Sequence, residues 1–216
     1  MIDALRITKL DFFTMKSQSV IYLSLVVIVL MFGFMGSSVT LLGITGAWFV
    51  SLMSSNIFAV QEKNNLDCLY GSVSVSLKDI VLGRYVFVFL NYLLSFLVVI
   101  VIHSGFALFQ NNALELPDFM PGFSLSFLVF STITGIQMPL FFKLGYTKAK
   151  GWSMIPFIAV MALVVAPSFV SALSGFIELI QSNRTASIVS AVLASCVIQF
   201  LSYQIAVVAY RKRKRV

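Results

Sequence analysis

The fold of this chain is decided by the stretch QEKNNLDCLYGSVSVSLKDIVLGRY, residues 61–85, the longest polar interruption in an otherwise apolar sequence. It separates two apolar runs that are each long enough to cross a bilayer as a helix. Its second half has the pattern of a short helix with serine caps, a charged face and an apolar side. In chain order the residues of this predicted helix are Ser74, Val75, Ser76, Leu77, Lys78, Asp79, Ile80 and Val81. Such a helix suits contact with another protein, and a solvated connector is the alternative.

The composition places the protein in a membrane. The 216 residues are 59% hydrophobic and only 11% charged, whereas soluble domains carry roughly 25% charged residues. Only helices and closed barrels can span a bilayer, and the apolar runs here are continuous rather than alternating. We therefore predict an all-α integral membrane protein. The basic residues flank the apolar runs and form no soluble basic face, which excludes a nucleic-acid-binding protein.

The apolar runs predict six transmembrane helices. These cover residues 19–35, 39–60, 85–109, 123–142, 154–176 and 186–210. They form a transmembrane domain of residues 18–210, with a cytoplasmic loop at 61–84 and a basic tail at 211–216. Pro167 predicts a kink or break in the fifth span, after which residues 168–185 are irregular or re-enter the membrane. No cleavable signal peptide is expected, so the first span stays as an anchor.

The distribution of charge fixes the predicted orientation. Fourteen of the 15 lysines and arginines flank one side of the spans, and only Arg184 flanks the other. Because loops on the cytoplasmic side carry the excess of basic residues, both termini are predicted to be cytoplasmic. Residues 1–17 mix charged and apolar side chains and predict a cytoplasmic interfacial helix, with a frayed tail as the alternative.

A ridge of small side chains follows one face of the second predicted span. Its members, at four-residue spacing, are Gly43, Ala47, Ser51, Ser55 and Ala59. Such a ridge lets another backbone approach closely. The partner is either another helix of the same bundle or a second chain.

The sequence carries little that resembles catalytic chemistry. It has no GxxxxGK[ST] loop for nucleotide phosphates and no paired carboxylates within its spans. Its one histidine, His103, precedes Ser104, and neighbouring side chains diverge on a helix, so a packing role is favoured over a catalytic one. Cys68 and Cys196 have neither metal-ligand spacing nor a shared compartment, so neither a metal site nor a disulfide is expected. Energy for uphill transport would have to come from outside the chain.

Two motifs resemble those of the ABC-2 type exporter permeases. Residues 61–85, with Glu62-Lys63 near the start and Gly83-Arg84 near the end, resemble the loop that follows the second span of that family. Ser74 stands where the family often has proline, and Leu77 where it often has arginine. Residues 139–150, PLFFKLGYTKAK, look like the Pro-aromatic-Lys-x-Gly-x-x-Lys-Ala-Arg signature of one branch of small permeases. Within the family, the likeness is greatest to permeases that export phenol-soluble modulins from Gram-positive bacteria.

The resemblance implies a type V exporter-like fold and the transmembrane subunit of an ABC exporter in a bacterial cell membrane. Two permease chains, identical or siblings, would work with two ATPase subunits, which would bind the ATP and Mg²⁺ while this chain binds no cofactor. The predicted helix at 74–81, with Glu62, would be the coupling helix that docks in the ATPase. The implied cargo is amphipathic peptides such as phenol-soluble modulin-like toxins, with antimicrobial peptides as further candidates.

The resemblance also implies that the second and fifth spans of each permease chain line the translocation path. On the second span the residues concerned are Gly43, Ala47, Ser51, Ser55, Asn56 and Ala59. Three other functions remain as alternatives. These are an immunity or accessory membrane protein that binds peptides without transporting them, an intramembrane enzyme using His103, and a passive channel. The channel is disfavoured because no span offers rings of charge for ion selection.

Overall fold

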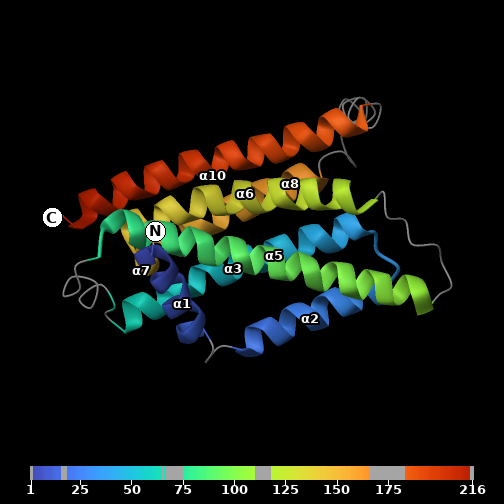
Figure 1. Ribbon diagram of the computed structural model, residues 1–216, viewed down its shortest axis with the longest axis horizontal. Coiled ribbons are helices and arrows are strands. Elements are labelled where there is room, and N and C mark those ends of the chain that lie inside the picture. Colours follow the sequence, from blue (N-terminus) through green and yellow to red (C-terminus); the bar gives the residue numbers. More distant parts are fainter. Residues whose placement is uncertain are drawn as a thin grey trace.

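The computed structural model describes residues 2–15, 19–64, 66, 75–109, 118–165 and 183–214, and these parts contain helices and no strands. Long helices lie side by side in an elongated bundle, and the N-terminal helix crosses one end of it (Figure 1). The elements are α1 (Ile2–Met15), α2 (Ser19–Phe34), α3 (Val39–Lys63), α5 (Leu77–Phe109), α6 (Phe119–Leu144), α7 (Tyr146–Ala149), η3 (Trp152–Met154), α8 (Ile155–Val165) and α10 (Arg184–Lys214).

Four helices, α3, α5, α6 and α10, are long and apolar enough to cross a membrane. The helices α1 and α2 form a bent pair whose axes differ by 80°. If this pair counts as one span, the number of candidate spans rises to five. The described part of the fifth predicted span is the short apolar helix α8, and the rest, with Pro167, lies outside the described residues. The structure thus gives a multi-pass helical membrane protein, and the number six stays a prediction.

The predicted short helix and the third predicted span form one continuous helix, α5. Ser76 caps its start, because its Oγ accepts a hydrogen bond from the amide of Asp79 (3.1 Å) and donates one to Oδ2 of Asp79 (2.7 Å). No proline interrupts the chain between Leu77 and Phe109, so the helix runs on through Gly83 for 33 residues. At 1.5 Å per residue it is about 50 Å long, which exceeds a hydrocarbon core of about 30 Å. Part of α5 therefore extends beyond the hydrocarbon core.

The centre of the bundle is packed with aromatic side chains from α5 and α6. Tyr92 of α5 stacks on Phe130 of α6 with ring centroids 4.5 Å apart, and its hydroxyl lies 2.8 Å from Oγ of Ser126. A Cβ on Gly43 of α3 would lie 3.1 Å from Cβ of Ser126, so α3 lies close against α6 at this level. Close packing around small residues is the usual way in which membrane helices associate.

Candidate functional site

One end of the bundle collects the basic residues. At this end α3, α6 and α10 finish, α5 begins, and α7 and both termini lie (Figure 1). The described basic residues on these segments are Lys63, Lys78, Arg84, Lys143, Lys148, Lys150, Arg211, Lys212, Arg213 and Lys214. Arg184, at the start of α10 on the opposite end, forms an ion pair with Asp118. We call the first region the basic end, and the segregation of charge matches the predicted pattern.

The N-terminal helix α1 packs against the start of α5. Its inner face is formed by Ala4, Ile7, Thr8, Asp11 and Met15, all of which are buried. The hydroxyl of Thr8 donates a hydrogen bond of 2.9 Å to the carbonyl oxygen of Gly83, and the rings of Phe12 and Phe87 meet edge to face at 4.7 Å. Leu5 and Phe13 on the outer face are 58% and 65% exposed. The helix is thus part of the bundle, and its placement at the membrane surface stays a prediction.

The approach of α1 to α5 depends on Gly83. A Cβ on this residue would lie 2.7 Å from the carbonyl oxygen of Ala4 and 2.8 Å from Cβ of Ile7. Any larger side chain would push the two helices apart, so glycine is required here for its lack of volume.

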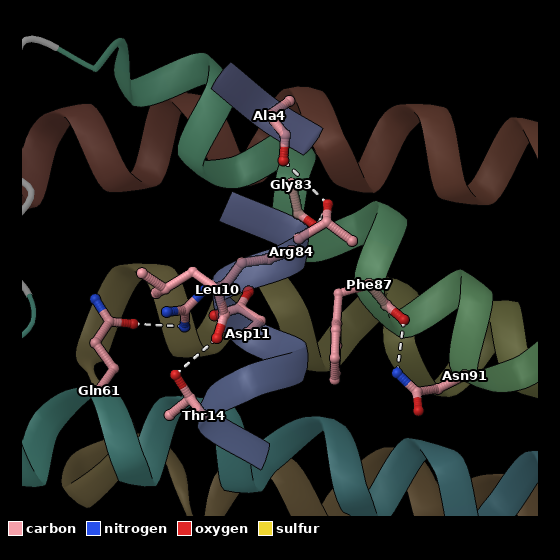
Figure 2. A network of polar contacts seen from close by, with 10 residues as sticks. Ala4, Leu10, Asp11, Thr14, Gln61, Gly83, Arg84, Phe87 and Asn91 are labelled. Carbon is pink, nitrogen blue, oxygen red and sulfur yellow. Dashed lines mark hydrogen bonds and ion pairs between the residues drawn. The ribbon is translucent and has the colours of Figure 1, made fainter. Parts of the chain in front are cut away.

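Arg84 is the centre of a buried polar cluster. Its Nη1 donates a hydrogen bond of 2.6 Å to Oε1 of Gln61 on α3, and its Nε lies 3.5 Å from Oδ2 of Asp11 on α1. Figure 2 shows these three side chains converging from three helices. The guanidinium also lies over the ring of Phe58, 4.9 Å from its centroid. A single side chain of α5 therefore holds α1 and α3 together.

The second polar cluster joins α3 to the turn between α6 and α7. Oε2 of Glu62 accepts hydrogen bonds from the amides of Tyr146 (2.7 Å) and Thr147 (3.2 Å), and its Oε1 accepts one from the hydroxyl of Thr147. The turn is made by Gly145 at φ +80°. A Cβ on Gly145 would lie 3.3 Å from Oε2 of Glu62 and 3.2 Å from Nη2 of Arg213. Glu62 thus binds the first amides of a helix, with a basic residue of α10 close by.

These hydrogen bonds also set the acidity of Glu62, which lies beyond the apolar part of α3. The hydroxyl of Thr147 contributes most, and the amides of Thr147 and Tyr146 and the charge of Arg213 add to it. All of them favour the carboxylate, so the pKa of Glu62 lies below its ordinary value although partial desolvation acts in the opposite direction.

Aromatic packing connects the two clusters. Phe58 of α3 stacks on Phe141 with centroids 4.9 Å apart and meets Phe142 edge to face at 5.1 Å. Phe142 in turn meets Tyr210 of α10 at 5.2 Å. We call this region the junction, defined as Asp11, Phe58, Gln61, Glu62, Arg84, Phe141, Phe142, Tyr146, Thr147 and Tyr210. It joins α1, α3, α5, α6, α7 and α10 at the basic end.

A family model described as ABC-2 family transporter protein matches residues 7–211. This chain belongs to the ABC-2 transporter family. The matched region includes every residue of the junction. No curated protein and no solved structure matches the chain. The permease is thus a membrane component of an ABC transporter rather than an enzyme, and the family works with ABC ATPase subunits.

The predicted coupling residues of the permease differ in how far they are exposed on the chain. Ile80 and Val81 are 1% and 0% exposed and pack in the core of the chain, and their part in coupling stays a prediction. Glu62 binds the α6–α7 turn of its own chain. Lys78 is exposed, while Val75, Leu77 and Asp79 are half-buried. Ser74 lies outside the described residues.

The predicted path residues of the permease also separate into two sets. Gly43, Ala47 and Ser51 are buried within the chain's own bundle. The part of the small-residue ridge nearer the start of α3 therefore packs inside the subunit. Ser55, Asn56 and Ala59 are half-buried and lie nearer the basic end of α3. The ring of His103 packs edge-on to Phe119 at 5.8 Å, in keeping with the packing role favoured from sequence.

The permease also has an apolar pocket of about 590 Å³ between α5, α6 and α10. Its wall holds two polar contacts: Oη of Tyr85 lies 2.5 Å from Oγ of Ser202, and Nε2 of Gln199 donates a 2.8 Å hydrogen bond to Oγ1 of Thr134. Sequence reasoning did not find this pocket. The lining residues are Leu82, Tyr85, Val86, Val88, Phe89, Phe127, Phe130, Thr134, Met138, Cys196, Gln199, Phe200 and Tyr203.

Proposed function

We propose that this permease exports amphipathic peptides, such as phenol-soluble modulin-like toxins and antimicrobial peptides, through the membrane of a bacterial cell. Its basic end faces the cytoplasm, where two ATPase subunits bind ATP and Mg²⁺. Two permease chains, identical or siblings, form the path. The junction is the observation that carries the proposed coupling between the ATPase and the spans. It lies at the basic end and joins α1 and α7 to α3, α5, α6 and α10, the four long candidate spans.

The ATPase docks at the projecting start of α5. The capped turn of Leu77, Lys78 and Asp79 lies at the basic end, and α5 is too long for the hydrocarbon core alone. Movement of this turn would reach α1 through the contact between Thr8 and Gly83, and α3 through Arg84 and Gln61. The ATPase thus displaces several spans as one body rather than one helix alone.

The test of docking is co-purification of the ATPase with a charged variant at this turn. Leu77→Asp is expected to lose the bound ATPase while the permease still inserts in the membrane. Met120→Asp is the matched control, because Met120 is 67% exposed on α6 at the opposite end. Equal recovery of the ATPase with both variants would contradict the docking site.

The apolar pocket supports the proposed class of cargo. Aromatic rings and a methionine line it, and such side chains adapt to apolar faces of different shape. An amphipathic helix can bury its apolar face there while its polar face remains outside. ATP-driven uptake of a helical amphipathic peptide into inverted vesicles is expected, and uptake of a scrambled peptide of equal composition is not. Binding without uptake would instead favour the accessory-protein function.

A further inference from the structure

A second pocket, of about 570 Å³, lies at the basic end between α6 and α10. Its wall combines three cationic side chains with an apolar patch and contains no acidic residue. Lys143 comes from α6, and the other lining residues, all from α10, are Gln204, Ile205, Val208, Ala209, Lys212 and Arg213. The site differs from the larger apolar pocket, with which it shares no residue.

The pocket changes from apolar to cationic along α10. Its lining residues on this helix recur at four-residue spacing and therefore share one face. Ile205 and Val208 are 58% and 54% exposed, and they precede Lys212 and Arg213 along the chain. From Ile205 to Arg213 the helix rises about 12 Å. An occupant would thus meet apolar side chains first and positive charges about two turns later.

We propose that this pocket binds an anionic phospholipid of the leaflet at the basic end. The phosphate group lies between Lys143, Lys212 and Arg213, and an acyl chain follows Ile205 and Val208. Charge complementarity carries the choice of occupant, because the lining has three cations and no acid. Glu62, outside the lining, offsets part of the charge of Arg213, and Lys143 and Lys212 keep the pocket positive and suited to a phosphate. Basic pockets between membrane helices bind anionic headgroups in this way. The order of the lining also matches a lipid, whose charge sits at the membrane edge and whose chains point inward.

The lipid site and the junction share one residue. Arg213 lines the pocket, and its Nη2 would lie 3.2 Å from a Cβ placed on Gly145, in the turn that Glu62 binds. A phosphate in the pocket therefore draws α10 towards Lys143 of α6, beside that turn. Bound anionic lipid is expected to stabilise the basic end, where α6, α7 and α10 meet.

The test measures binding of phosphatidylglycerol to the purified permease in nanodiscs of phosphatidylcholine. Lys143→Gln with Lys212→Gln is expected to weaken binding about 25-fold, since each cation near anionic lipid is worth about fivefold in affinity. Lys148→Gln with Lys150→Gln is the matched control, because both lysines are exposed at the basic end outside the pocket. Equal affinity in the two double variants overturns the proposal.

Two further measurements separate a lipid from other occupants. Val208→Trp fills the apolar part of the pocket and is expected to weaken lipid binding, while millimolar inorganic phosphate is expected not to displace the lipid. Displacement by phosphate alone would overturn the lipid assignment in favour of a simple anion site. Unchanged lipid affinity in Val208→Trp, with loss of self-association of the permease, would overturn it in favour of a second copy of the chain.

Discussion

The Nε atom of Arg84 lies 3.5 Å from Oδ2 of Asp11, and both side chains are buried. Among the described residues, Oδ2 of Asp11 and both Nε and Nη2 of Arg84 make no hydrogen bond. The pair is therefore held by charge and packing more than by directed bonds. Burying two ions is costly, and removal of one leaves the other uncompensated. The two charges thus act together in the attachment of α1 to α5, beside the contacts at Gly83 and Phe87.

The first prediction concerns this ion pair. Arg84→Met is expected to lower the free energy of unfolding by about 3–5 kcal/mol, because it leaves a buried carboxylate without its partner. The double variant Asp11→Leu with Arg84→Met is expected to recover most of that loss, since neither charge remains. Denaturant titration of the permease in detergent measures both. A double variant less stable than either single one would show that the polar pair stabilises the bundle outright.

The second prediction concerns the contact between α1 and α5. Gly83→Ala is expected to cost about 1–3 kcal/mol, because the added methyl meets the backbone of Ala4 and must displace α1. In a chain that also carries Thr8→Cys, release of α1 would expose the new thiol to maleimide. Gly105→Ala is the matched control in the same helix, since a Cβ there meets nothing within 4 Å. It should be neutral or slightly stabilising, and equal behaviour of the two variants would refute the close approach.

The third prediction is a pH dependence at Glu62. Its pKa is lowered in the folded permease, chiefly by the hydroxyl of Thr147. A lowered pKa means that this stabilisation is present above the pKa of the unfolded chain, about 4.3, and is lost as the pH falls through the folded value. Thermal stability should therefore fall on acidification below about pH 4.3. Glu62→Gln should remove this part of the acid response, and an identical pH profile in the variant would exclude the contribution.

Local sequence patterns predicted the limits of several helices but not how the helices meet. The second predicted span was expected to start at residue 39 and the third to end at 109, and α3 starts at Val39 while α5 ends at Phe109. These limits follow from hydropathy and turn residues, which are local. The short helix at 74–81 was predicted as separate because Gly83 and Arg84 looked like a boundary. In the structure Gly83 is a packing position inside α5.

The junction could not be predicted because its partners are far apart in the chain. Glu62 and Tyr146 are separated by 84 positions, and no local pattern pairs them. Both belong to motifs that carried the family resemblance, and the structure brings these motifs into contact. A weaker signal existed for Asp11, an acid at helical spacing with the buried Ala4, Thr8 and Met15 on α1. Its partner Arg84 was assigned only to the cytoplasmic loop that precedes the third predicted span.

The fourth prediction is the orientation in the membrane. The basic end is expected to face the cytoplasm, because cytoplasmic segments carry the excess of lysine and arginine. In a chain with Cys68 and Cys196 replaced by serine, Met120→Cys should react with an impermeant maleimide on intact cells. Lys148→Cys should react only after permeabilisation. The reverse pattern of labelling would invert the orientation, and with it the site of the ATPase.

The central claim is that the junction transmits the movement of the ATPase to the spans. Its most direct test is the amount of amphipathic peptide transported per ATP hydrolysed, in proteoliposomes that hold the permease and its ATPase. Glu62→Ala with Thr147→Val separates α3 from the α6–α7 turn and leaves the start of α5 intact. This variant is expected to bind the ATPase and hydrolyse ATP while the transport ratio falls about fivefold or more, within the usual range of coupling between sites. An unchanged ratio, with ATP hydrolysis intact, would contradict the claim.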